Sequence, residues 1–112
     1  MTTLLPRDSE NNVIPAVRLK GQSAHAINAT AASARNSTAF ADDTQIISVY
    51  ATVPVRLRFG DDSVSAVATD HYFPAGVYYD FSIGGGKVNH YSHLAILREG
   101  STDGVVYISE KE

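Results

Sequence analysis

The sequence contains four histidines, and two of them, His90 and His93, lie three residues apart. Two imidazoles at this spacing could share a metal ion if they lay on one face of a helix. The surrounding residues lack a helical pattern, and positions three apart on a strand point to opposite faces. Neither a cysteine nor a glutamate partner follows at ligand spacing. We therefore expect hydrogen-bonded or solvated histidines, and no cofactor.

A run of three glycines and a lysine at residues 84–87 is superficially similar to a phosphate-binding loop. Such a loop needs glycines on either side of four residues, a serine or threonine after the lysine, and a following helix. A valine follows the lysine here. The run therefore predicts a flexible hairpin tip.

Acidic and hydroxyl side chains could supply a carboxylate pair or an activated nucleophile. No spacing singles out a pair, no nucleophile elbow is present, and acids beside glycine in a β protein are usually turn formers. A cupin-like enzyme would need a His-x-His cluster with a following glutamate, which the sequence lacks. We expect no catalysis from the residues considered: Asp61, Asp62, Asp70, Asp80, Ser63, Ser82, His71 and His93.

Aromatic side chains are concentrated between residues 72 and 79. Tyrosine offers a large apolar surface with a polar tip, which suits both sugar stacking and protein contacts. Phe73 and Tyr79 fall on the alternation expected of core residues, whereas Tyr78 falls on the opposite face. We therefore predict that Tyr72 and Tyr78 belong to an interface. Arg56 and Arg58 are expected to point outward on the same face as Tyr50.

The elements that must position these side chains are β-strands. Apolar residues alternate with polar ones throughout residues 46–59, which is the pattern of a strand with one buried face. Pro54 cannot donate to a ladder, so we divide this run into two strands joined by a turn at residues 52–54, which predicts a hairpin.

Further short strands follow between glycine-, proline- and aspartate-rich turns. Residues 64–67 predict a short strand, and residues 77–83 predict another whose odd-numbered side chains are buried. Residues 93–98 and 105–109 predict a closing hairpin. Nearer the N-terminus, residues 13–19 and 24–29 predict strands, and residues 29–34 a short helical turn. The fold class expected is all-β, a single antiparallel β-sandwich of jelly-roll or immunoglobulin-like topology.

Residues 1–12 are polar and turn-rich, with too little apolar surface to offset the entropy of ordering them. We interpret them as a flexible N-terminal arm, followed by one β-sandwich domain over residues 13–112. Such an arm gains order by lying on a neighbour, so Arg7 and Asp8 are predicted interface residues.

The composition excludes several classes of function. The chain has 112 residues, a net charge of −3 and no cysteine. No basic field is available for nucleic acid, and neither disulfides nor zinc–thiolate sites can form. The sequence shows neither a signal peptide nor a long apolar segment, so we expect no export by that route and no membrane partner.

Several segments share the turn and strand patterns of one class of proteins: ASAR at 32–35, ISVY at 47–50, VRLRFGD at 55–61, SVSA at 63–66, FPAG at 73–76 and GVVYIS at 104–109. With these segments the chain resembles small phage and prophage virion structural proteins, from about residue 14 to the C-terminus. The resemblance implies a β-sandwich that serves as a capsid decoration, head fibre or tail-associated subunit.

The partners implied are other copies of the chain, as a homo-oligomer for which we expect a trimer, and other virion proteins. The location implied is the virion, assembled in the host cytoplasm. A carbohydrate-binding β-sandwich module is the alternative, with the tyrosines as its stacking platform.

Overall fold

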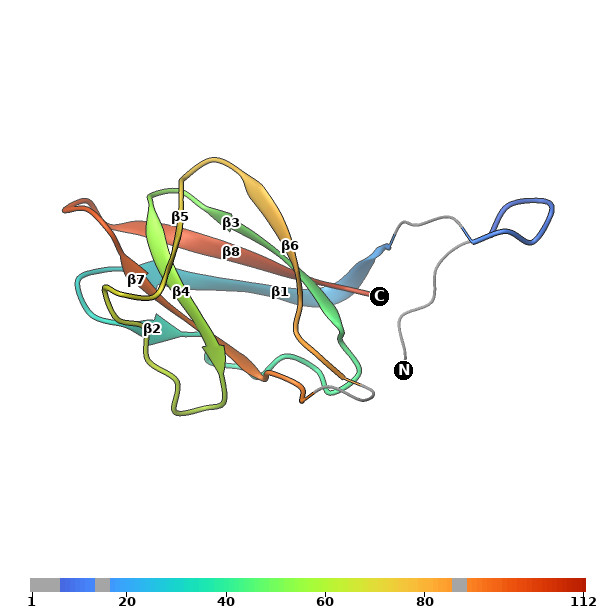
Figure 1. Ribbon diagram of the computed structural model, residues 1–112, viewed down its shortest axis with the longest axis horizontal. Helices are drawn as coiled ribbons and strands as arrows, with labels where there is room; N and C mark the ends of the chain where they lie inside the picture. Colours follow the sequence, from blue (N-terminus) through green and yellow to red (C-terminus); the bar gives the residue numbers. More distant parts are fainter. Residues whose placement is uncertain (1–6, 14–16, 86–88) are drawn as a thin grey trace.

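A computed structural model describes residues 7–13, 17–85 and 89–112, and its named elements within these ranges are all β-strands (Figure 1). The all-β prediction is therefore confirmed. No helix within the described ranges could span a membrane. The strands are β1 (Leu19–Ala29), β2 (Ala34–Arg35), β3 (Ile46–Ala51), β4 (Val55–Gly60), β5 (His71–Phe73), β6 (Tyr78–Ser82), β7 (His93–Arg98) and β8 (Gly104–Lys111).

The strands form two four-stranded antiparallel sheets that pack face to face (Figure 1). The first sheet has the order β1-β8-β3-β6 and the second the order β2-β7-β4-β5. Each of the first four strands pairs with one of the last four: β1 with β8, β2 with β7, β3 with β6 and β4 with β5. This is a long antiparallel ribbon rolled into a sandwich, the jelly-roll arrangement.

The core lies between the sheets and is built from the alternate residues that the period-two pattern indicates. In β3 the buried apolar residues are odd-numbered, and β4 continues the same parity. The inward positions expected near the C-terminus are likewise almost fully buried. The buried cluster comprises Ile27, Ala29, Phe40, Ile47, Val49, Ala51, Val55, Leu57, Ile83, Leu94, Ile96, Val106 and Ile108.

The hairpin predicted over residues 46–59 is wrong, because β3 and β4 belong to different sheets. The turn between them crosses from one layer to the other, where Thr52 N donates to Val105 O and Glu99 N donates to Pro54 O. Both sheets present an apolar face to the same core, so the parity of buried residues continues across the turn.

The predicted closing hairpin is wrong for the same reason, since β7 lies in the second sheet and β8 in the first. The consecutive strands that do pair are β4 and β5, joined by residues 61–70. The strand expected at 64–67 is absent from this described connection. Its amides bond to side chains instead of to a strand: Ala66 N donates to Ser33 Oγ, which is distant in sequence, and Val67 N donates to a carboxylate oxygen of nearby Asp70.

The N-terminal half also departs from expectation. One strand, β1, covers residues 19–29, with an irregular register between Leu19 and Ala24 where Gln22 has a φ of 60°. Part of the strand expected at 13–19 lies outside the described residues. The helical turn expected at 29–34 is replaced by a bend and β2, because Thr30 bonds locally to Ala32 and Ala34 pairs with β7. Val77 was expected to be buried but is 44% exposed.

Candidate functional site

The two tyrosines predicted as interface residues lie on opposite outer faces of the sandwich. Tyr72 is in β5 opposite Arg56 of β4, on the outer face of the second sheet. Tyr78 is in β6 opposite Tyr50 of β3, on the outer face of the first sheet. The turn between β5 and β6 crosses from one sheet to the other, so the aromatic segment does not form one patch.

The face that carries Tyr72 is covered by ion pairs. The guanidinium of Arg56 lies 5.1 Å from the centre of the Tyr72 ring and binds Glu99 with an Nε–Oε2 distance of 2.7 Å. Arg58 binds Asp70 at 2.9 Å. The hydrogen bond from Arg56 is the main reason that the pKa of Glu99 lies below its usual value. Tyr50 is not on this face, contrary to expectation, because β3 and β4 lie in different sheets.

Tyr78 lies at the end of a row of three tyrosines across the first sheet. The backbone register places Tyr107 of β8 beside Tyr50 of β3, and Tyr50 beside Tyr78 of β6. The Tyr50 and Tyr78 rings are 4.7 Å apart, and Tyr78 and Tyr107 are 69% and 49% exposed. We call these three residues the tyrosine row.

Small side chains surround the tyrosine row. A second row crosses the same outer face two residues further along each strand. It consists of Ala24, Ser109, Ser48 and Asp80, which lie side by side. Lys111 Nζ binds Asp80 at 2.8 Å, and a shallow hollow of about 330 Å³ lies between these groups and Tyr78. We call this surface, with the tyrosine row, the tyrosine face. The charges of Lys111 and Asp80 on this face neutralise each other.

Other aromatic residues close the edge of the sandwich between the two sheets. The Phe73 ring packs edge-on against Tyr79 at 5.0 Å and against Phe81 at 5.3 Å, and Tyr91 stacks on Phe59 at 5.7 Å. Phe59, Phe73 and Phe81 are partly buried against the core. These aromatics therefore contribute to folding, as the alternation indicates for Phe73 and Tyr79.

Arg7 and Asp8, the other predicted interface residues, lie in a small loop closed by a bridge between Arg7 and Val13. Figure 1 draws this loop in dark blue, beyond the end of the sheets. Asp8 Oδ1 accepts hydrogen bonds from the amides of Glu10 and Asn12, and the bond from Asn12 is the main reason that the Asp8 pKa is lowered. Arg7 donates to the carbonyl of Asn11.

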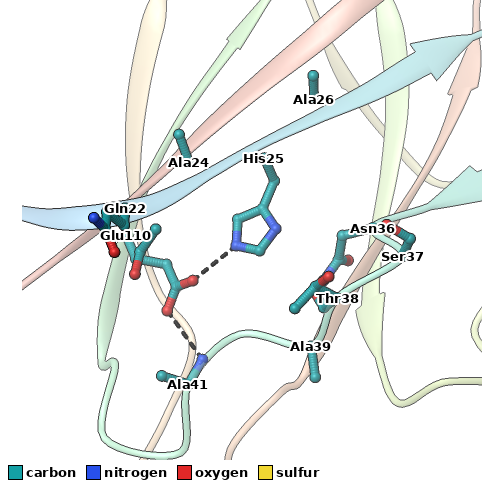
Figure 2. A pocket seen from close by; sticks show the side chains of 11 residues that line it. Gln22, Ala24, His25, Ala26, Asn36, Ser37, Thr38, Ala39, Ala41 and Glu110 are labelled. Atoms are coloured by element: carbon teal, nitrogen blue, oxygen red, sulfur yellow. Dashed lines mark hydrogen bonds and ion pairs between the residues drawn. The ribbon is translucent and has the colours of Figure 1, made fainter.

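The sequence did not reveal a buried pair of titratable side chains, His25 and Glu110. Figure 2 shows the imidazole and the carboxylate facing each other beneath β1, with Nε2 and Oε2 2.7 Å apart. Their side chains are 10% and 4% exposed. Both occupy inward positions of paired strands, since His25 lies opposite Ile108, two residues before Glu110. The one available signal was an acid at a position where the alternation of β8 requires an inward side chain.

Both oxygens of the Glu110 carboxylate have hydrogen-bond partners. Its Oε1 accepts hydrogen bonds from Thr44 Oγ1 at 2.5 Å and from Ala41 N at 3.0 Å, while Oε2 faces His25. Burial is the largest single influence on the Glu110 pKa and raises it, but these hydrogen bonds together outweigh burial and lower it. The carboxylate is therefore ionised at neutral pH.

A pocket of about 430 Å³ opens beside this pair, between β1 and the loop of residues 36–41 (Figure 2). Buried Asn36 anchors the loop, because its amide donates to the carbonyls of Thr38 and Ser92 and accepts from Leu94 N. The Phe40 ring packs edge-on against His25 at 5.1 Å. The His25 ring is therefore fixed by the Glu110 carboxylate and by the Phe40 ring.

The other chemistry-bearing residues are dispersed or used locally. His90 bonds to the carbonyl of Thr44, and His93 to Ser92 Oγ. Ser63 bonds to Asp61, and Ser82 to Gly84 N. Among the described residues, no three His, Cys, Asp or Glu side chains gather as a metal site. Of the glycine run, residues 86 and 87 lie outside the described ranges.

No known protein family, curated protein or solved structure matches this chain.

Proposed function

We propose that this chain is a non-enzymatic structural subunit of a phage or prophage virion, which acts by self-association and docking. The tyrosine row carries the proposal. Three tyrosines from adjacent strands stand together on one outer face, and tyrosine supplies large contact area at low entropic cost. Exposed aromatic groups gathered on one face are typical of interaction surfaces.

The occupant proposed for the tyrosine face is a second copy of the chain. Two copies that each carry a net charge of −3 repel each other least where the contacting surfaces are neutral. The tyrosine face meets this condition, because Lys111 and Asp80 neutralise each other. The opposite face carries the Arg56–Glu99 and Arg58–Asp70 pairs, whose desolvation would oppose contact.

The virion setting rests on the resemblance of the sequence to small phage structural proteins. The jelly roll agrees with it by analogy, because this fold recurs in viral capsid proteins and also in lectins. In this proposal the subunit assembles in the host cytoplasm as a homo-oligomer, with a trimer as the expected state, and then docks onto other virion proteins.

The oligomeric mass in solution tests the proposal. Sedimentation of the full chain should give a multiple of the 12.0 kDa protomer. Replacing Tyr50, Tyr78 and Tyr107 together by serine should shift the mass to one protomer while leaving the circular dichroism spectrum unchanged. An Arg56→Ala variant of the opposite face is the matched control and should stay oligomeric. A monomeric wild-type chain at all concentrations would refute self-association.

Carbohydrate binding is the second candidate, and the same row favours it. Tyrosines aligned on a flat sheet can stack on the apolar faces of sugar rings. On this alternative, soluble oligosaccharides quench tyrosine fluorescence and the triple serine variant loses the quenching, whereas the wild-type protein remains a monomer. The two candidates therefore differ in the mass of the wild-type protein.

A further inference from the structure

The second ring nitrogen of His25 is directed into the pocket beside β1. Figure 2 shows Nδ1 turned away from Glu110, on the side of the ring where Asn36 and Thr38 lie. Within the described ranges, no protein group forms a hydrogen bond with Nδ1, although the side chain is only 10% exposed. A buried polar atom without a protein partner is costly, so its partner is expected to come from the pocket.

The partners of Glu110 determine which hydrogen His25 carries. An ionised carboxylate only accepts hydrogen bonds, so the nitrogen 2.7 Å from Oε2 must be the protonated one. In the neutral imidazole, Nδ1 is then a bare acceptor. In that form of the ring, the pocket presents an acceptor that suits a hydroxyl or another donor of a bound molecule.

The remaining polar groups of the pocket point to a neutral ligand. Its lining includes the side chains of Gln22, Ser23, Ser37 and Thr38, which both donate and accept hydrogen bonds. No lysine or arginine is part of the described lining to attract an anion, and the Glu110 carboxylate is already directed to Thr44, Ala41 and His25. Sugar hydroxyls also donate and accept, and they match this mixture of groups.

We propose that this pocket binds a neutral sugar of monosaccharide size, with a sugar hydroxyl donating to His25 Nδ1. The volume of about 430 Å³ lies within the range of roughly 300–1,000 Å³ found for small-molecule sites. Glu110 is a positioning residue, because it fixes the tautomer and the orientation of the ring. The site opens at the β1 edge of the tyrosine face and shares Ala24 with it, but its hydrogen-bonding groups lie outside that face, so binding does not depend on self-association.

The test is a titration of the full chain with D-glucose, D-galactose and N-acetylglucosamine, followed by nuclear magnetic resonance. At least one sugar should shift the ring proton resonances of His25 and the amide resonances of residues 36–41 saturably. His25→Ala should weaken binding at least about fivefold, the loss expected for one hydrogen bond. The exposed histidine variant His71→Ala is the matched control and should bind as the wild type does.

A second variant guards against loss of folding in His25→Ala. Thr38→Val retains the His25–Glu110 pair and changes only a hydroxyl of the pocket wall, and it should also weaken binding. The proposal is overturned if none of the three sugars shifts these resonances, or if only methylammonium chloride or sodium acetate does. Sugar binding that survives in His25→Ala but is lost in the triple tyrosine variant also overturns it, because the sugar then binds the tyrosine face.

Discussion

Tyr72 and Tyr78 lie on opposite outer faces of the sandwich, although only one turn separates β5 from β6. This arrangement makes the pair a test of which face assembles. Tyr78→Ala should raise the dissociation constant of the oligomer at least about fivefold, the effect of losing an interface contact worth about 1 kcal/mol or more. Tyr72→Ala should leave it unchanged. Sedimentation over a concentration series measures both, and equal effects would argue against the tyrosine face.

The buried face of β4 can be checked by comparing neighbouring residues. Leu57 is 2% exposed, so Leu57→Ala should lower the free energy of unfolding by about 2–5 kcal/mol. Arg56→Ala should cost less, about 1 kcal/mol, because its ion pair with Glu99, its hydrogen bond to Asp70 O and its contact with the Tyr72 ring are all at the surface. Phe81→Ala should fall between them, since Phe81 is only partly buried on an edge strand. Denaturant unfolding measures these free energies. If Arg56→Ala costs more than Leu57→Ala, the buried face of β4 is assigned wrongly by one residue.

Glu110 should make folding sensitive to acid. Its folded-state pKa lies below the ordinary value, so the stabilisation is fully present above the unfolded-state pKa of about 4.3. It is lost as the pH falls through the lowered folded-state pKa. Glu110→Gln replaces an acceptor by an amide donor that faces other donors, and should cost about 1–3 kcal/mol at neutral pH.

Unfolding curves at pH 7 and at successively lower pH test this expectation. The wild-type advantage over Glu110→Gln should shrink as the pH falls. Asp103→Asn is a suitable control, since Asp103 is exposed, pairs with Arg98 and lies far from the core. A constant difference between wild type and Glu110→Gln at every pH would show that ionisation of Glu110 does not stabilise the fold.

Gly84 should be intolerant of substitution. Its φ is +89°, and a Cβ atom there would lie 2.0 Å from the carbonyl oxygen of Asn89. Gly84→Ala should therefore lower the free energy of unfolding by at least about 1–3 kcal/mol from backbone strain alone. Gly100→Ala is the matched control, because a Cβ atom there meets nothing within 4 Å. Thermal unfolding of the two variants should differ clearly; similar midpoints would contradict the described turn.

The N-terminal arm can be tested by deletion of residues 2–12. The Arg7–Val13 bridge and the Asp8 hydrogen bonds are local to the arm, so the deletion should leave the β-sandwich folded. Incorporation into particles, or oligomeric mass, should decrease if the arm lies on a neighbouring subunit. Unchanged assembly after deletion would leave the tyrosine face as the contact.

The period-two pattern predicted the fold class and most of the core correctly. Leu94, Ile96, Val106 and Ile108 are each 0–1% exposed, as their alternation predicts. The pattern could not predict the candidate sites, because each unites residues distant in sequence. Tyr50, Tyr78 and Tyr107 come together only through strand register, and His25 and Glu110 through the pairing of the first strand with the last.

The sequence by itself therefore determined that the chain forms short strands and, for β3, β4, β7 and β8, which side is buried. Only the tertiary structure decided which strands are neighbours, and so replaced the two predicted hairpins by crossings between sheets. The physical reason is that alternation reports burial against a core, and both sheets of a sandwich bury their inner faces in the same core. Strand pairing depends instead on backbone hydrogen bonds, which every non-proline residue offers alike.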